Sequence, residues 1–186
     1  MDIETFSLWP TPIYKLNTKD WLDVSEIYTE LLCNISFKDT QLLQFNNIDS
    51  NDIPLTQSIL QIQHEKVWKS LEEFCGRGFR EKIQSSWMFY SKTGEGLEPH
   101  LHSGSALFTS ALYLTDSSSD LVLLDPRFNA CRGYPEDVRH KHFSPFRIKP
   151  KAGDLYLFPC YVQHHVASGP TIPRLSILTD YYFETV

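Results

Sequence analysis

From residue 85 onward the chain breaks into short apolar runs. Gly, Pro, Ser and Asp separate these runs, which cover residues 86–90, 107–114, 121–124, 154–158 and 175–183. Runs of this length, rich in aliphatic and aromatic residues and bounded by turn formers, are typical of strands. Several of them in succession predict a β-sandwich or jelly roll.

The first half of the chain has a helical texture. Residues 19–33 carry a rough apolar stripe, and residues 57–75 carry a clearer one with spacings of four, three, four and three, namely Leu60, His64, Val67, Leu71 and Phe74. Residues with these spacings lie on one face of a helix. His64 is part of this apolar face, so we expect it to pack in the core rather than to bind a ligand. Gly76 and Gly78 follow and predict its end.

These elements predict an α+β fold that is mainly β. Helices within residues 1–85 would pack on one sheet of a jelly roll formed by residues 86–186. The length of 186 residues fits one domain with a substantial core. We therefore expect a single domain spanning residues 1–186.

Charge and hydropathy exclude several classes of protein. The net charge is −6, and the one basic cluster, within residues 139–151, is a solvated loop or a local anchor for an anionic substrate. No evidence for nucleic-acid binding follows from it. No apolar run reaches 18 residues, so no membrane span is expected, and the acidic N-terminus lacks the pattern of a secretory signal.

Four cysteines are present, and none forms a Cys-x-x-Cys pair. Their spacing matches no zinc-finger pattern, and reduced thiols in a cytoplasmic protein are the expected state. The oligomeric state cannot be read from the sequence, and a homodimer remains open.

Four of the seven histidines fall in two places, His100-Leu101-His102 and His164-His165. Residues i and i+2 of a strand point to one face, so His100 and His102 can meet one ion. A third histidine from a distant strand would complete one face of an octahedron and leave positions for substrate and O₂, as in non-haem iron oxygenases. Taken alone, such a pair is as often a surface or packing feature.

Arg174 and Ser176 lie on the apolar run that follows His164. They also share a strand face. An arginine binds a carboxylate through two parallel charge-assisted hydrogen bonds, and a serine hydroxyl can add a third. This pattern favours a binding site for one carboxylate of a dicarboxylate co-substrate. The alternative is that Arg174 forms a salt bridge at the edge of the protein.

A family resemblance runs through these segments. Gly94 and the following His100-Leu101-His102 are similar to a stretch in which a Gly precedes the motif PHxH. Residues 109–114 are similar to an "SGVYYL" strand, and residues 125–127 are similar to a DPR turn. Residues 153–159 are similar to a "GxLxLFP" strand, and residues 173–177 are similar to an "RxSI" strand. Residues 8–14 resemble an "LFPTPVY" opening. The chain thus resembles the 2-oxoglutarate/Fe(II) oxygenases with a prolyl-hydroxylase-like double-stranded β-helix, closest to small bacterial and phage members.

The resemblance implies a site. Fe(II) would be held by His100, His102 and His164, since the family's ligand follows the residue matching Phe158 by six positions. The distal carboxylate of 2-oxoglutarate would be held by Arg174 and Ser176. Tyr90 and Tyr113 are expected either to hydrogen-bond the co-substrate or to pack in the core. Asp125, Arg127 and the loop 126–145 are expected to meet the substrate, and the alternative for this loop is a surface insertion.

One departure from the broad superfamily concerns His102. A carboxylate is the usual second ligand, and three neutral imidazoles leave the full double charge on the metal. Either Glu98 or Asp125 could supply the missing carboxylate.

The expected function is a 2-oxoglutarate-dependent dioxygenase that hydroxylates a small molecule or an amino-acid or protein side chain and releases succinate and CO₂. One alternative is a three-histidine iron dioxygenase without 2-oxoglutarate, in which Arg174 and Ser176 would have no role. Another is a non-catalytic metal-binding β-sandwich.

Overall fold

The computed structural model describes residues 11–38, 40–92, 94–102, 106–117, 119–127, 131–169 and 172–184. Its β-strands form two antiparallel sheets. The larger sheet has the order β1-β8-β5-β10-β3-β2, with bounds Tyr14–Leu16, Leu155–Pro159, Ala106–Tyr113, Arg174–Glu184, Glu81–Ser91 and Thr40–Gln44. The smaller sheet has the order β4-β9-β6-β7, with bounds Leu97–His100, His164–Val166, Leu121–Leu123 and Phe146–Ile148.

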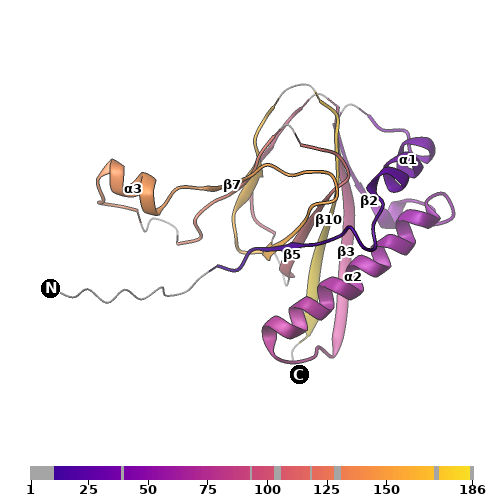
Figure 1. Ribbon diagram of the computed structural model, residues 1–186, viewed down its shortest axis with the longest axis horizontal. Helices are drawn as coiled ribbons and strands as arrows, with labels where there is room; N and C mark the ends of the chain where they lie inside the picture. The colour runs from indigo at the N-terminus through magenta and orange to yellow at the C-terminus, as the bar shows by residue number, and fades with distance from the viewer. Residues whose placement is uncertain are drawn as a thin grey trace.

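From β3 to β10 the chain passes repeatedly between the two sheets, except from β6 to β7, which are paired neighbours in the smaller sheet. β3, β5, β8 and β10 lie in the larger sheet, and β4, β6, β7 and β9 lie in the smaller one. The sheets face each other across an apolar interior that includes Leu121, Tyr156 and Phe158 (Figure 1). This arrangement is a double-stranded β-helix, so the predicted fold class is confirmed.

β10 is the central strand of the larger sheet. It pairs with β3 along its full length and with β5 on its other side, where the register shifts between Tyr181 and Tyr182. Its side chains alternate between two environments. Leu175, Ile177 and Tyr181 are fully buried on the face that meets the helices, and Arg174 and Ser176 face the smaller sheet.

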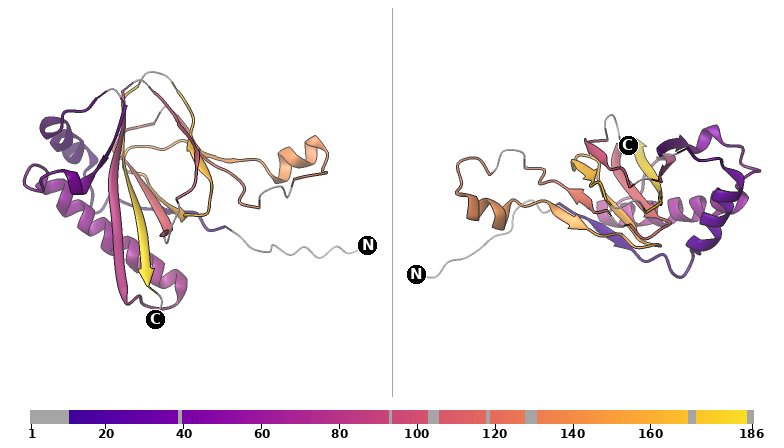
Figure 2. Two further views of the ribbon diagram at one scale, coloured as in Figure 1. Left: turned by 180° about the vertical axis from the view of Figure 1, so that it is seen from behind. Right: turned by 90° about the horizontal axis from the view of Figure 1, so that it is seen from above.

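Two helices cover the outer face of the larger sheet. α1 spans Val24–Asn34 and begins at Asp23, whose carboxylate accepts from the backbone of Ser25 and Glu26. The longer α2 spans Pro54–Cys75 and ends at Gly76, which adopts a left-handed conformation with φ 67°. Both helices lie on the same side of the sandwich (Figure 2).

A third helix projects away from the body. α3 spans Glu136–His142, has no buried residue and extends on the side opposite to α1 and α2 (Figures 1 and 2). It belongs to the segment between β6 and β7, which includes the loop 126–145 predicted to meet the substrate. A short 3-10 helix, Phe45–Asn47, follows β2.

The N-terminal part of the chain is less purely helical than predicted. β1 and β2 come from it and join the edges of the larger sheet, and β3 begins at Glu81, before the predicted boundary. Residues 8–10 of the family-like opening lie outside the described residues. No helix within the described ranges has the length and hydropathy required to cross a membrane.

Candidate active site

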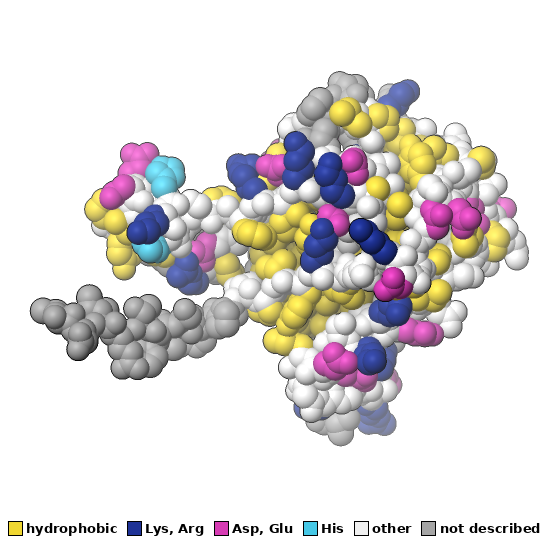
Figure 3. Space-filling view, viewed as in Figure 1, with side chains coloured by type: hydrophobic (Ala, Val, Ile, Leu, Met, Phe, Trp, Pro, Cys, Tyr) yellow, Lys and Arg dark blue, Asp and Glu magenta, His cyan; other side chains and the backbone are white. Residues whose placement is uncertain are grey.

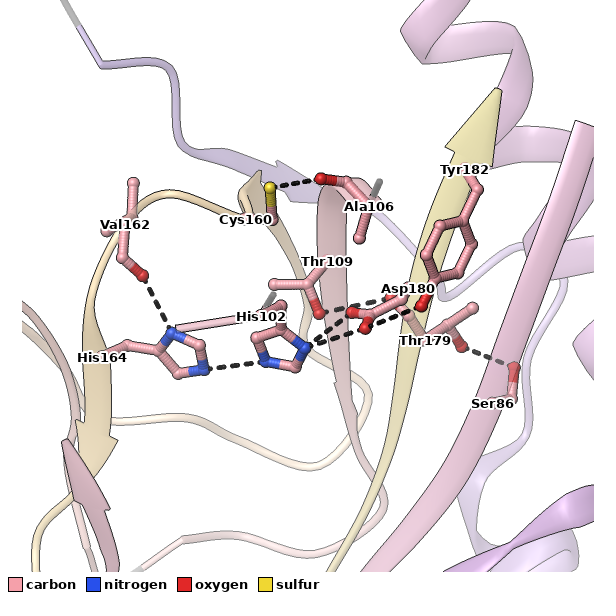
Figure 4. Close-up of polar contacts among 10 residues, drawn as sticks. All are labelled: Ser86, His102, Ala106, Thr109, Cys160, Val162, His164, Thr179, Asp180 and Tyr182. Carbon is pink, nitrogen blue, oxygen red and sulfur yellow. Dashed lines mark hydrogen bonds and ion pairs between the residues drawn. The ribbon is translucent and has the colours of Figure 1, made fainter. Parts of the chain in front are cut away.

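Three histidine side chains converge between the two sheets. His100 is the last residue of β4, His164 is the first residue of β9, and the two are partners across this antiparallel pair. His102 places its Nε2 atom 3.3 Å from Nε2 of His164 (Figure 4). One ligand atom from each ring lies within 4.8 Å of the other two. The structure therefore brings together the three residues that the sequence predicts as metal ligands.

His102 reaches this position from outside the strand. β4 ends at His100, and His102 lies beyond it without regular secondary structure. Side chains of the larger sheet hold its ring instead. The ring stacks on Trp87 of β3, with centroids 5.7 Å apart and an interplanar angle of 23°, and its Nδ1 contacts Asp180 of β10. Contrary to what the spacing predicted, His102 therefore does not share a strand face with His100, although the two rings do meet.

The hydrogen bonds of the three rings determine where their protons lie. Nδ1 of His100 and Nδ1 of His164 face backbone carbonyl oxygens at 2.8 and 3.0 Å, and Nδ1 of His102 faces the carboxylate of Asp180. These oxygens only accept, so each neutral ring carries its proton on Nδ1 and leaves Nε2 unprotonated. Three converging lone pairs repel one another unless a cation lies among them. The donor set therefore fits a metal ion.

Burial keeps the His164 ring in the neutral form that a metal ion would require. Desolvation, together with the nearby rings of His100 and His102, lowers the pKa of His164 to about 4, so this ring is neutral at physiological pH. At metal–imidazole bonds of about 2.1 Å, nitrogens on adjacent corners of an octahedron lie about 3 Å apart. The 3.3 Å between His102 and His164 is close to that separation. Among the described residues, the cluster contains no fourth His, Cys, Asp or Glu donor, so the site has open positions.

The two neighbouring histidines of β9 have different environments. His164 is 6% exposed, and its ring contacts Phe158 edge-on at 4.9 Å. His165 is half-buried and alternates to the other side of the strand. The metal-binding cluster includes His164 and not His165.

A small cavity of about 30 Å³ lies beside the histidines. Its walls include all three rings together with Arg174, Ser176 and Tyr113 of the larger sheet. This space exceeds the minimum needed for one water molecule, and its walls combine the three imidazoles with a guanidinium and the hydroxyl groups of Ser176 and Tyr113.

Arg174 is a buried cation without a counter-charge. It is 3% exposed, and its Nη2 donates to the carbonyl oxygen of Glu95 at 3.0 Å. Its Cζ lies 5.0 Å from the centroid of the Phe89 ring. No carboxylate in the described part of the chain pairs with it. Since a buried charge is costly unless it is paired, the site favours an anion at the guanidinium.

Of the two predicted tyrosines, one lies at the cavity. Tyr113 is 3% exposed and lines it beside Arg174, and desolvation raises the pKa of its phenol well above the ordinary value. Tyr90 is directed to the opposite face of the larger sheet, since it pairs in register with Leu175 and its ring packs on Phe37 at 4.6 Å. Tyr90 is thus a packing residue of the helical side, and the expected contact with a co-substrate is corrected.

Asp125 and Arg127 lie in a separate groove of about 850 Å³, between the β1 edge of one sheet and the β7 edge of the other. Nη2 of Arg127 lies 2.5 Å from the Asp125 carboxylate. The groove shares no lining residue with the histidine cavity, although the carbonyl of its wall residue Val162 accepts from His164. Figure 3 shows apolar side chains beside Lys and Arg side chains where the α3 arm meets the body.

The carboxylate nearest to the three ligands is neither of the two that the sequence suggested. Glu98 is exposed, and Asp125 is paired in the other groove. Asp180 instead lies against His102, with its two oxygens 2.8 and 3.0 Å from Nδ1 (Figure 4). Sequence reasoning missed it, although it shares the strand parity of Arg174 and Ser176.

Comparisons with known proteins identify the family of the chain. Residues 85–180, just over half of the chain, match the family model described as "Putative 2OG-Fe(II) oxygenase". The chain therefore belongs to the 2-oxoglutarate/Fe(II) oxygenase family, whose cofactor is Fe(II) and whose co-substrate is 2-oxoglutarate. No curated protein matches the sequence significantly.

Solved structures share the fold at low sequence identity. A Pseudomonas putida prolyl-4-hydroxylase is 12% identical with TM-score 0.60, covering 94% of each chain. HygX from Streptomyces hygroscopicus, with nickel and 2-oxoglutarate bound, is 12% identical with TM-score 0.62 and covers 92% of this chain and 83% of its own. A Trichoplax adhaerens prolyl hydroxylase in complex with a hypoxia-inducible-factor peptide is 15% identical with TM-score 0.59, covering 92% and 83%.

Proposed function

We propose that this oxygenase is a hydroxylase that consumes 2-oxoglutarate and releases succinate and CO₂. The observation that carries the proposal is the unpaired, buried Arg174 in the wall of the cavity that holds the three histidines. A dicarboxylate with one end at the metal would place its other end within reach of that guanidinium. A three-histidine dioxygenase without 2-oxoglutarate would have no use for this buried charge.

The residues then divide into two groups. His100, His102 and His164 hold Fe(II) through their Nε2 atoms. Arg174 binds the distal carboxylate of 2-oxoglutarate, and Ser176, which is 4% exposed on the same face of β10, adds a hydroxyl donor. Tyr113 lies beside Arg174 with its phenol kept protonated by burial, so it can donate to a carboxylate oxygen.

With Fe(II) bound, a site of this class couples the decarboxylation of 2-oxoglutarate by O₂, which gives succinate and CO₂, to insertion of one oxygen atom into a substrate C–H bond. The protein's contribution is to hold the co-substrate in one orientation and to exclude water. The two apolar walls of the cavity, which include Phe89 and Phe158, serve this second purpose.

The substrate is a small molecule or an amino-acid side chain, free or in a protein. The groove at β1 and β7, of about 850 Å³, has room for an extended ligand. Asp125 and Arg127 line that groove and are the candidate substrate contacts. The four cysteines are all free thiols, which favours a cytoplasmic location.

An anaerobic titration tests the proposal. Fe(II) is added to the apo-protein, followed by 2-oxoglutarate, and the visible spectrum is recorded. The expected result is a metal-to-ligand charge-transfer band that requires both additions. Iron binding without any effect of 2-oxoglutarate would indicate a three-histidine dioxygenase instead. Stoichiometric zinc that resists chelation, with no iron-dependent activity, would indicate a structural metal site.

A further inference from the structure

Asp180 makes a two-oxygen contact with a ligand histidine. Its Oδ2 accepts from Nδ1 of His102 at 3.0 Å, and its Oδ1 lies 2.8 Å from the same nitrogen. The carboxylate is 5% exposed, and Figure 4 shows it between the ring of His102 and the hydroxyl of Tyr182. His102 in turn lies between Asp180 and His164.

No cation compensates this buried carboxylate. Its other polar contact is the Tyr182 hydroxyl, which donates to Oδ2 at 3.4 Å. Within the described ranges, no lysine or arginine forms an ion pair with it. Burial of an unpaired carboxylate is costly, so the positive charge that balances Asp180 must come through the ring of His102.

The backbone holds Asp180 firmly at this place. It lies in the central strand β10, opposite Ser85 of β3 on one side and Thr109 of β5 on the other. His102, by contrast, has no strand of its own. Asp180 is therefore held by strand pairing on both sides, whereas the ring of His102 is held by its side-chain contacts, among them the one with Asp180.

We propose that Asp180 supplies, through the ring of His102, the negative charge that a directly bound carboxylate supplies in sites of the His-x-Asp or His-x-Glu type. The inference rests on the proposed metal site. A carboxylate that accepts from Nδ1 fixes the tautomer and the orientation of the ring, and it makes Nε2 a more basic ligand. The site then has the same net charge as a metal site whose ligands are two histidines and one carboxylate. The negative charge of Asp180 differs only in lying behind the imidazole ring of His102 instead of contacting the metal.

The first test measures metal affinity without turnover. Anaerobic calorimetry of the apo-protein with Fe(II), and with Co(II) as a spectroscopic probe, gives the dissociation constants. Asp180→Asn keeps an acceptor for Nδ1 but removes the charge, and we expect Fe(II) to bind roughly 10- to 100-fold more weakly. Asp154→Asn is the matched control, because Asp154 is also a buried carboxylate, paired with Lys15 away from the histidines. Its affinity should equal that of the wild type.

The second test separates an effect transmitted through the ring of His102 from general support of the fold. In the His102→Asp background the ring is absent and the metal gains a direct carboxylate, so Asp180→Asn should cost less than about threefold or should improve binding. A role in supporting the larger sheet that does not involve His102 would give the same loss in both backgrounds. Asp180→Glu and Asp180→Gln form a further pair of equal size, which serves if Asp180→Asn does not fold. The Glu variant should bind at least about tenfold more tightly than the Gln variant.

The outcomes distinguish this inference from the proposed function. Wild-type protein that binds no Fe(II) would overturn both. Wild-type protein that shows the 2-oxoglutarate-dependent band, with Asp180→Asn binding Fe(II) equally well, would overturn only the role of Asp180. Equal losses in Asp180→Asn and Asp154→Asn would also overturn it.

Discussion

The guanidinium of Arg174 lies over the aromatic ring of Phe89, with its Cζ 5.0 Å from the ring centroid. The two residues belong to adjacent strands, β10 and β3, at the end of the cavity where the co-substrate anchor is proposed. A planar guanidinium can stack in this way and still present its N–H groups edge-on to a carboxylate. The Phe89 ring therefore restrains the orientation of the guanidinium N–H groups that would bind the carboxylate of the co-substrate.

Replacement of Arg174 by lysine should weaken 2-oxoglutarate binding even though the charge is kept. An ammonium cannot form two parallel hydrogen bonds or stack on Phe89. We expect a loss of roughly 10- to 100-fold, measured from the 2-oxoglutarate dependence of the charge-transfer band. Fe(II) affinity should not change. Arg147→Lys, in the other groove, is the control. Unchanged 2-oxoglutarate affinity in Arg174→Lys would show that Arg174 does not bind the distal carboxylate.

The neighbouring histidines of β9 offer a matched pair of variants. His164→Gln removes a proposed ligand, and we expect Fe(II) affinity to fall by more than the roughly 100-fold that loss of an outer hydrogen bond costs. His165→Gln should leave the affinity unchanged, because this side chain alternates away from the cluster. Calorimetry on both apo-proteins decides the point. Equal effects at the two positions would contradict the placement of the metal.

Gly96 should tolerate no side chain. A Cβ at this position would collide with the carbonyl oxygen of Val166 and lie 2.9 Å from the backbone nitrogen of Ser168. Gly96→Ala should push β4 away from β9 and lower the free energy of unfolding by about 1–3 kcal/mol. It should also weaken Fe(II) binding, because these two strands carry His100 and His164. In Gly78→Ala the new Cβ would have only an ordinary contact, 3.5 Å from Glu72, and this variant is the control for urea unfolding and for calorimetry.

The pH dependence of stability should report His64, a half-buried histidine of α2 outside the proposed metal site. Desolvation lowers the pKa of His64 to about 4, whereas the unfolded chain has the ordinary value of 6.5. Between these values the unfolded state binds the additional proton. Stability therefore falls as the pH drops from about 6.5 to about 4. The same sign applies to His164 in the apo-protein.

His64→Gln should reduce this acid sensitivity. Urea unfolding of the apo-protein at pH 7 and pH 4.5 gives the change in the free energy of unfolding, and we expect the variant to lose about 1–3 kcal/mol less than the wild type. His140→Gln changes an exposed side chain of α3 and serves as the control. An equal loss in the wild type and His64→Gln would show that protonation of His64 does not limit stability.

Several strands and both long helices were predictable because apolar residues recur along each of them and form its buried face. The five apolar runs after residue 85 lie in β3, β5, β6, β8 and β10, and the two amphipathic stretches lie in α1 and α2. β1, β2 and β7 were missed because three to five residues are too few for alternation to be read, and the short strands β4 and β9 were expected only around their histidines. β4 even contains Pro99. Helix α3 has no buried residue and hence no apolar stripe.

Two features of the site depended on contacts between sheets. His102 could be identified as a candidate ligand, but not as a residue beyond the strand end that a neighbouring sheet holds in place. Asp180 lies within a predicted strand and shares its parity with Arg174 and Ser176, so its direction was readable. Its contact with His102 was not readable, because sequence alone does not show which strand of one sheet faces which strand of the other.

β10 carries both the proposed co-substrate anchor and the carboxylate behind the metal site, on one face and in one unbroken strand. Single substitutions along it change one contact at a time. Insertion or deletion of one residue between Ser176 and Asp180 would turn every following side chain to the opposite face and separate the two functions. Over evolutionary time this segment can therefore vary in composition far more readily than in length.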